Sequence, residues 1–237
     1  MAGHTVAFLS EEWVQTISIT GLGMLSFLVV GSRLSMPNRH KLLKVLAFFM
    51  ISITVFGHFF QAMNGNWLVT EELPLHLCGI SNLICCVILF VPRKQLLFEF
   101  LFYCGIIGGL QALLTPLINN YNGESYIYFQ FFFRHGAIIV FPLFMRFLLG
   151  MQLQKFSWFQ SFLILNVLLL VIMPLNFALG SNYMYLAQPP GVNHVLVMGE
   201  WPYYILYWEF FIVALFYGCY FIFKHRGASQ STSFFVS

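Results

Sequence analysis

The chain has 237 residues, of which 59% are hydrophobic and only 8% are charged, and its mean hydropathy is +0.81. Soluble domains carry about 25% charged residues. The composition therefore excludes a water-soluble fold, which could not bury this much apolar surface, and the small net charge of +3 does not indicate a nucleic-acid partner.

Apolar runs separated by polar breaks predict an all-α, polytopic membrane protein. A helix needs roughly 20 apolar residues to cross a bilayer and satisfies its own backbone hydrogen bonds in lipid. We expect a single domain, residues 1–237, formed by one bundle of seven transmembrane helices. In chain order these are predicted at about 13–31, 42–62, 75–92, 96–114, 127–149, 157–178 and 202–223.

The basic residues predict the orientation of this bundle. Ten of the eleven fall at one set of helix ends: Arg33, Arg39, Lys41, Lys44, Arg93, Lys94, Arg146, Lys155, Lys224 and Arg226. Basic residues are retained on the cytoplasmic side of short loops. We therefore expect a multi-pass protein of the cell membrane with its N-terminus outside, its C-terminus in the cytoplasm, and membrane lipids rather than nucleic acid as partners.

The five cysteines all lie inside hydrophobic segments, so a disulfide in an extracellular loop is not expected. Free cysteine behaves as a small buried hydrophobe, which is the interpretation we favour for Cys85, Cys86, Cys104 and Cys219. Cys78 differs because it follows His76 by two residues, and an imidazole can activate a thiol.

Polar side chains within the membrane are costly unless paired or hydrated, which makes them functional candidates. At 1.5 Å rise per residue, only Glu99 lies toward the cytoplasmic side. Such groups can also be interhelical hydrogen-bond partners that hold the bundle together, and Arg134 could pair with Glu209. Six polar or nucleophilic groups share the outer half, which predicts a polar cavity there: His58, His76, Cys78, Gln111, His135 and Glu209.

Several classes of protein are disfavoured by residues that the chain lacks. A retinal photoreceptor needs a lysine in the middle of its seventh helix, whereas Lys224 lies at the predicted cytoplasmic end. No metal-ligand spacing is visible among the histidines, and no phosphate-binding or dinucleotide fingerprint occurs. We therefore expect neither a metal nor another cofactor.

The string Leu73-Pro74-Leu75-His76-Leu77-Cys78 begins a set of motifs that resembles the bacterial YwaF-type integral membrane proteins. That family is related to animal transmembrane protein one-six-four, an acyltransferase that loads polyunsaturated chains onto ether phospholipids. The resemblance implies a seven-helix fold in a bacterial plasma membrane and lipid acyl transfer. The other matching segments are Gln111–Pro116, Gln130–His135, Gly180–Leu186 and Gly199–Tyr203.

The catalytic residues carry over only in part. His76 and His135 match the family, but the cysteine that serves as acyl carrier in the animal proteins corresponds to Leu75. Cys78 lies three residues farther on, about one helical turn along the same face, so it could present a thiol to the same cavity.

The favoured hypothesis is a membrane acyltransferase that moves a fatty acyl chain onto a lysophospholipid or similar acceptor near the outer leaflet. His76, Cys78 and His135 are the predicted catalytic residues, either through a thioester on Cys78 or with a histidine as general base. Gln111 or Asn82 would steady the carbonyl oxygen. The predicted substrate-binding residues are His58, Gln111, Gln130, Arg134, Asn182, Tyr183 and Glu209.

Two other hypotheses remain open. The same cavity could belong to a non-enzymatic transporter or receptor that binds a small molecule without turnover. In an accessory membrane protein, the polar groups would be purely structural.

Overall fold

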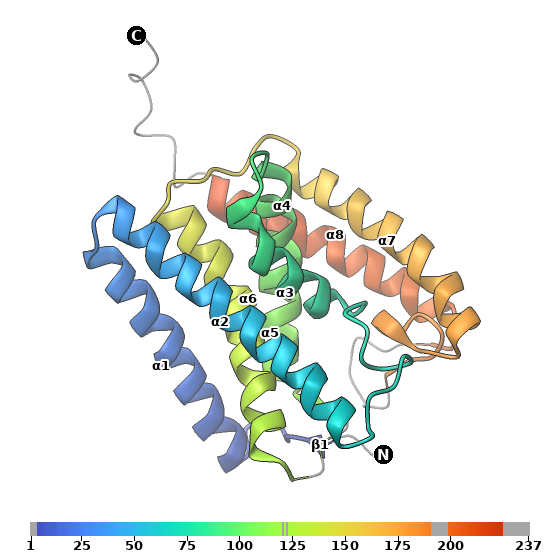
Figure 1. The fold of residues 1–237 in the computed structure, drawn as a ribbon. Helices are drawn as coiled ribbons and strands as arrows, with labels where there is room; N and C mark the ends of the chain where they lie inside the picture. Colours follow the sequence, from blue (N-terminus) through green and yellow to red (C-terminus); the bar gives the residue numbers. More distant parts are fainter. Residues whose placement is uncertain (1–3, 120, 122, 191–198, 225–237) are drawn as a thin grey trace.

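The computed structural model describes residues 4–119, 121, 123–190 and 199–224, and helices dominate it (Figure 1). The long helices are α1 (Glu11–Arg33), α2 (Met36–Met63), α6 (Ser125–Phe147), α7 (Ser157–Leu179) and α8 (Tyr203–Lys224). The shorter ones are α3 (Leu77–Val87), α4 (Gln95–Phe100) and α5 (Ile106–Leu114). Single turns lie at Ile88–Phe90 and Tyr183–Tyr185, and a π-helical segment, Leu101–Gly105, joins α4 to α5. Strands β1 (His4–Thr5) and β2 (Leu117–Ile118) pair antiparallel, with His4 opposite Ile118.

Each predicted apolar run is helical, so the all-α membrane fold is confirmed. Among the described residues, six helices are long and apolar enough to cross a membrane, and a seventh apolar segment, Leu77–Phe90, is shorter. The α4 to α5 stretch, Gln95–Leu114, counts as one of the six. Of the basic set, Arg226 lies outside the described residues.

The shorter segment differs most from its prediction, because the helix expected at 75–92 begins at Leu77 and its regular helical turns end at Phe90. His76 is the N-cap residue of α3, and its backbone is extended, with φ of −67° and ψ of 149°. At 1.5 Å per residue this segment is about 21 Å long, less than the hydrocarbon core of about 30 Å. Non-helical backbone at membrane depth is tolerated where it lines a cavity.

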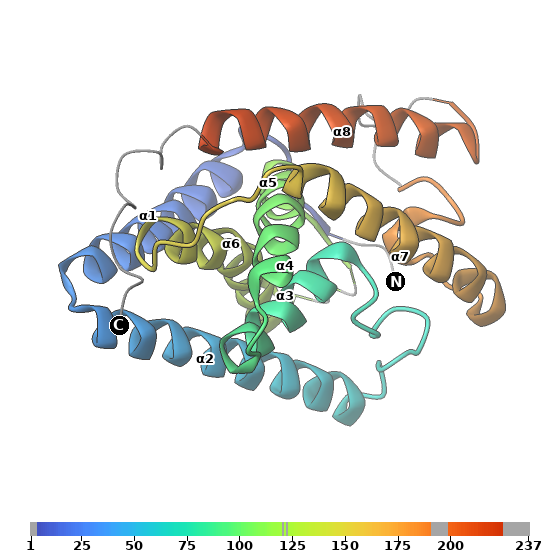
Figure 2. The same ribbon diagram turned by 90° about the horizontal axis from the view of Figure 1, so that it is seen from above.

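The helices form a centre and a periphery. Viewed from above, α1, α2, α7 and α8 surround α3 to α6 (Figure 2). Glycines allow α5 and its π-helical lead-in to lie close to α6. A Cβ at Gly105 would come within 2.9 Å of the Ile138 carbonyl oxygen, and one at Gly109 within 3.1 Å of the His135 carbonyl oxygen. This contact brings His135 next to α5.

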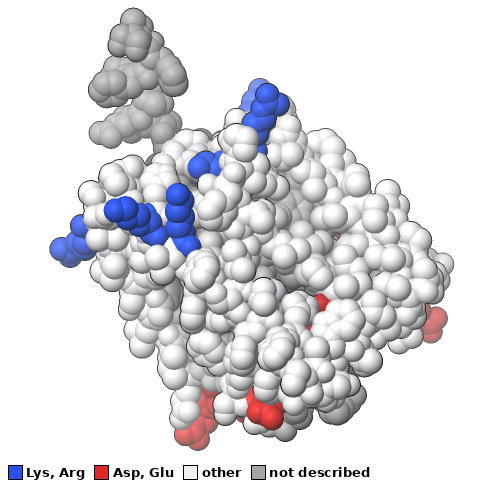
Figure 3. Space-filling model, viewed as in Figure 1, with Lys and Arg blue, Asp and Glu red and all other residues white. Residues whose placement is uncertain are grey.

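Charged side chains separate toward opposite ends of the molecule. On the face that Figure 3 shows, Lys and Arg gather at the end that holds the α1 to α2 turn, and the visible acidic residues lie away from it. Arg39 binds the carbonyl oxygens of Gly31, Ser32 and Leu148, which terminate α1 and α6. The basic end therefore also satisfies helix C-terminal carbonyls, which have no partner within their own helix.

Candidate functional site

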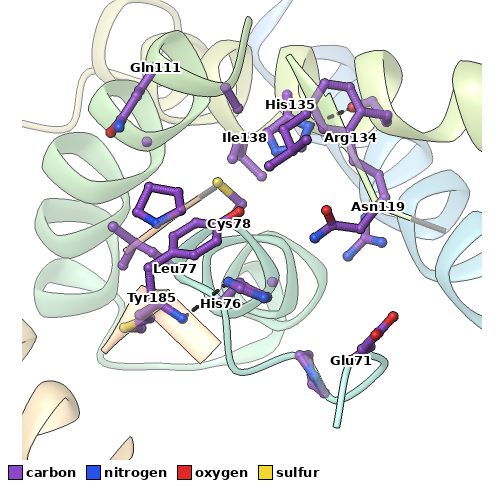
Figure 4. A pocket seen from close by; sticks show the side chains of 18 of the residues that line it. Glu71, His76, Leu77, Cys78, Gln111, Asn119, Arg134, His135, Ile138 and Tyr185 are labelled. Atoms are coloured by element: carbon purple, nitrogen blue, oxygen red, sulfur yellow. Dashed lines mark hydrogen bonds between the residues drawn. The ribbon is translucent and has the colours of Figure 1, made fainter. Parts of the chain in front are cut away.

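One cavity, of about 520 Å³, lies among α2, α5, α6, α7, α8 and the segments that precede α3 and α8. Its volume falls within the range of roughly 300–1,000 Å³ that small-molecule sites occupy. Its polar lining comes from α2, from residues 71–78, from α5 and α6, and from Glu209 of α8. Figure 4 shows the part that residues 71–78, α5 and α6 contribute. An apolar flank is formed where α5, α7 and α8 face the cavity.

Most of the residues predicted from the sequence line this cavity. All three predicted catalytic residues, His76, Cys78 and His135, contribute to the lining. Five of the seven predicted substrate-binding residues do so as well: His58, Gln111, Gln130, Arg134 and Glu209.

Asn182 and Tyr183, the other two predicted substrate-binding residues, do not line the cavity. Tyr183 is fully buried, and its hydroxyl donates to the Val69 carbonyl (2.7 Å) and accepts from the Leu73 N–H (3.0 Å). The Asn182 side-chain oxygen accepts the N–H groups of Ala187 and Gln188. Both residues shape backbone segments at the cavity rather than reach into it.

His76 caps the start of α3, and one of its nitrogens is already in use. The Met184 backbone N–H donates to His76 Nδ1 at 3.2 Å. The rings of Tyr183 and Tyr185 lie 5.2 and 5.6 Å from the imidazole. Because Nδ1 accepts a hydrogen bond, neutral His76 carries its proton on Nε2.

His135 has the opposite arrangement. Its Nδ1 lies 2.7 Å from the Phe131 carbonyl oxygen one turn earlier in α6, so Nδ1 must carry the proton in the neutral ring. Nε2 of His135 is then the lone-pair nitrogen. The cavity is therefore lined by one neutral imidazole that can donate a proton from Nε2 and another that can accept one at Nε2.

Cys78, and not Leu75, presents its side chain to the cavity. Leu75 is absent from the described lining and packs in a separate cluster that includes Tyr183 and Tyr204. A Cβ at Gly108 would lie 3.6 Å from the Cys78 Sγ, so the glycine leaves open space beside the thiol. In Figure 4 the thiol lies between Gln111 on one side and His135 and Arg134 on the other.

The alternative pairing of Arg134 with Glu209 is wrong in this structure. Glu209 Oε2 accepts from the Asn166 amide at 2.9 Å, and Oε1 is buried without a hydrogen-bond partner. His4 Nε2 lies 3.1 Å from Glu12 Oε1, which is an ion pair when that histidine is protonated. Within the described part of the chain, the Arg134 guanidinium makes no hydrogen bond or ion pair, although it lies within electrostatic range of Cys78 and Glu72.

Asn82 and Glu99 lie away from the cavity. The Asn82 amide donates to the Thr54 hydroxyl at 2.9 Å, so Thr54 and not Asn82 lines the cavity. Glu99 is buried and accepts from the Gln95 side chain and the Gln154 N–H at 2.8 and 2.7 Å. Of the two donors proposed for the carbonyl oxygen, only Gln111 remains in place.

The turn after α7 holds the group that fixes His76. Met184 and Tyr185 have φ of 55° and 54°, a left-handed conformation that residues other than glycine rarely adopt. Buried Asn176 braces this turn, because it accepts from Tyr183 N–H and Ser181 Oγ and donates to the Tyr183 carbonyl. Such strain persists only where the surroundings over-determine it.

The sequence interpretation missed several lining residues, among them Glu71, Asn119, Met184 and Tyr185. The Tyr185 hydroxyl interacts with the Asn119 side chain, which links the segments before α6 and before α8. Tyr185 belongs to the matching segment Gly180–Leu186, so the resemblance contained a signal for it. Nothing in the local sequence indicates that Asn119 approaches Tyr185.

The apolar flank reaches the surface of the bundle. Phe211 and Leu215 of α8 line the cavity, yet their side chains are 46% and 38% exposed. Gln111 of α5 also lines the cavity and is exposed. The cavity thus joins a polar compartment to apolar surface that a membrane would cover.

Comparison with known proteins places this site in a family. Neither a search of curated proteins nor one of solved structures gave a match. A model of the TMEM164 family matches residues 7–220, a span that includes every cavity residue discussed above. Because that match covers most of the sequence, the chain belongs to the TMEM164 family.

Proposed function

We propose that the chain is a membrane acyltransferase that moves a fatty acyl chain onto a lysophospholipid or a similar acceptor. The observation that carries this proposal is the shared cavity, which His76, Cys78 and His135 all line together with an apolar flank. An amphiphilic substrate needs both environments, because its acyl chain avoids water while its reacting ester or hydroxyl needs polar partners.

The hydrogen bonds of the two histidines suggest different roles, with His135 as the base and His76 as a hydrogen-bond donor. His135 Nε2 takes the proton of the Cys78 thiol as Sγ attacks the acyl carbonyl of the donor. The donor ester bond breaks, and its alcohol leaves with the proton from His135. The acceptor hydroxyl then attacks the thioester, its proton passes through His135 to the sulfur, and the acyl ester is formed.

His76 serves the carbonyl oxygen in this scheme. Its Nε2–H, set by the Met184 hydrogen bond, donates to the oxygen as negative charge develops there, together with the exposed Gln111 amide. In the direct route, His135 deprotonates the acceptor hydroxyl and no thioester forms. Both routes use the same two imidazoles, and they differ only in whether Cys78 is required.

We propose seven membrane crossings in a bacterial plasma membrane, with the N-terminus outside and the basic end in the cytoplasm. The separation of basic and acidic side chains supports this orientation (Figure 3). The cavity includes Glu71 and Glu72, so its polar compartment would lie toward the outer leaflet.

Acyl exchange by purified protein in liposomes tests this function. Labelled phospholipid and lysophospholipid are supplied, and product lipid is counted by mass spectrometry. We expect His76→Ala and His135→Ala to lower turnover by about 10²- to 10⁴-fold, the usual contribution of a positioned acid or base. His40→Ala is a matched control, because His40 bonds the Met36 carbonyl at the basic end of α2.

Cys78→Ala separates the two routes. Loss of turnover would support the thioester, whereas retained turnover would support direct base catalysis; Cys219→Ala controls for removal of a thiol outside the described lining. If the wild type showed no turnover with any of several donors and acceptors, the acyltransferase proposal would be wrong, and a binding or transport function would take its place.

A further inference from the structure

Arg134 is the single lysine or arginine among the described cavity-lining residues. Its guanidinium has five N–H donors, and none of them makes a hydrogen bond within the described part of the chain. A charged group at membrane depth is costly unless it is paired or hydrated. An arginine held in this state inside a cavity indicates an anionic ligand.

Neutral amides lie around Arg134, and the carboxylates of Glu71 and Glu72 line the same cavity. Gln130, one turn earlier on α6, lines the cavity, and α2 has Gly57 where any Cβ would come within 2.9 Å of the Gln130 amide. Asn119 also lines this side (Figure 4). Glu72 interacts electrostatically with Arg134, and its carboxylate accepts from Gln61 at 3.5 Å.

We propose that Arg134 binds the phosphate of a single-chain phospholipid whose acyl chain lies along the apolar flank. A guanidinium presents a planar fork that matches phosphate oxygens in a bidentate manner. The apolar lining from Leu165, Leu169 and Ile212 continues to the exposed Phe211 and Leu215 and accommodates the chain.

This inference rests on the proposed function and deepens it. In a lysophospholipid, the free glycerol hydroxyl lies within a few covalent bonds of the phosphate. Arg134 precedes His135 on α6, and both line the same cavity. A phosphate on Arg134 would therefore hold the hydroxyl in the compartment that His135 and Cys78 line.

Measurements of ligand binding, rather than of turnover, test the role of Arg134. Purified protein in detergent is titrated with a lysophospholipid, with a monoacylglycerol of the same chain, with the free fatty acid and with glycerol phosphate, and affinity is read from thermal shift and native mass spectrometry. We expect the wild type to bind the lysophospholipid at least about tenfold more tightly than the monoacylglycerol. Arg134→Gln should abolish that preference, because a charge-assisted hydrogen bond contributes roughly a tenfold to hundredfold change in affinity.

Two further variants keep the result interpretable if Arg134→Gln folds poorly. Arg134→Lys retains the charge without the fork, so it should bind the lysophospholipid with intermediate affinity and raise KM more than it lowers kcat. Arg93→Gln removes the same charge from an exposed position outside the described lining and should bind like the wild type.

The remaining arms identify the source of the anion. If glycerol phosphate stabilised the protein as much as the lysophospholipid does, the ligand would be a soluble phosphate and the proposal of a lipid ligand would be wrong. If the fatty acid bound with equal affinity and in an Arg134-dependent manner, the proposal of a phosphate group would be wrong. A phosphate preference that survives in folded Arg134→Gln protein, or one that is as large in Arg134→Lys as in the wild type, would overturn the role of Arg134. If lipid binding depended on Arg134 but no acyl exchange occurred, the proposed acyltransferase function would be wrong and the phosphate-binding role of Arg134 would stand.

Discussion

At the scale of single residues, His76 and His135 each use Nδ1 for a backbone hydrogen bond, in opposite senses. We expect ¹⁵N spectra of histidine-labelled protein, at a pH where both rings are neutral, to show the proton on Nε2 of His76 and on Nδ1 of His135. His76→Gln and His135→Gln would assign the signals. The same tautomer in both rings would contradict the assignment of His135 as the base and His76 as the hydrogen-bond donor.

Asn176 carries a second prediction, on stability. Asn176→Ala removes both hydrogen-bond partners of the Tyr183 backbone and leaves buried polar groups unsatisfied. We expect a loss of about 2–4 kcal/mol and a lower Tm in detergent. The exposed Asn38→Ala should leave Tm unchanged. If Asn176→Ala were as stable as the wild type, the turn at Met184 would be held by something else.

At the scale of the helices, two glycines have different roles: Gly105 allows close packing against α6, and Gly108 leaves space beside the Cys78 thiol. A Cβ at Gly105 would lie 2.9 Å from the Ile138 carbonyl oxygen, whereas one at Gly108 would lie at an ordinary 3.6 Å from the Cys78 Sγ. We expect Gly105→Ala to destabilise the bundle by about 1–3 kcal/mol, because overpacking forces helices apart. Thermal unfolding would measure this loss.

Gly108→Ala should fold normally but narrow the space beside the thiol, so it should lower acyl exchange without lowering Tm. Gly218→Ala, with nothing within 4 Å of the added Cβ, is the control for both variants. Equal loss of Tm in Gly105→Ala and Gly218→Ala would show that α5 and α6 do not depend on this close contact.

For the whole molecule, the short helix α3 decides the number of crossings. Seven crossings place the exposed Ser35 and Pro92 on one side and Ser125 on the other. We expect a membrane-impermeant maleimide added to intact cells to label Ser125→Cys, and to spare Ser35→Cys and Pro92→Cys until the membrane is opened. Labelling of the wild-type protein is the control, because it gives the background from the native cysteines. Labelling of Pro92→Cys from outside would show that Leu77–Phe90 does not cross.

The sequence by itself located the helices and the two chemically different ends. A membrane helix satisfies its own backbone, so the apolar composition of each run is enough to reveal it. A fixed rise per residue predicted a similar depth for His58, Cys78, Gln111 and His135, and all four line the same cavity. The beginning of α3 was misplaced by two residues, because the extended backbone of His76 delays the helix to Leu77.

Only the tertiary structure decided which polar groups face one another. The turn after α7 follows a left-handed path at Met184 and Tyr185 that Asn176 holds, so sequence spacing could not separate Tyr185, which lines the cavity, from Asn182 and Tyr183, which do not. The proton position on His76 depends on the Met184 N–H, 108 residues away in the chain. The partner of Glu209 was likewise beyond the sequence, because Asn166 on α7, and not Arg134, donates to its carboxylate.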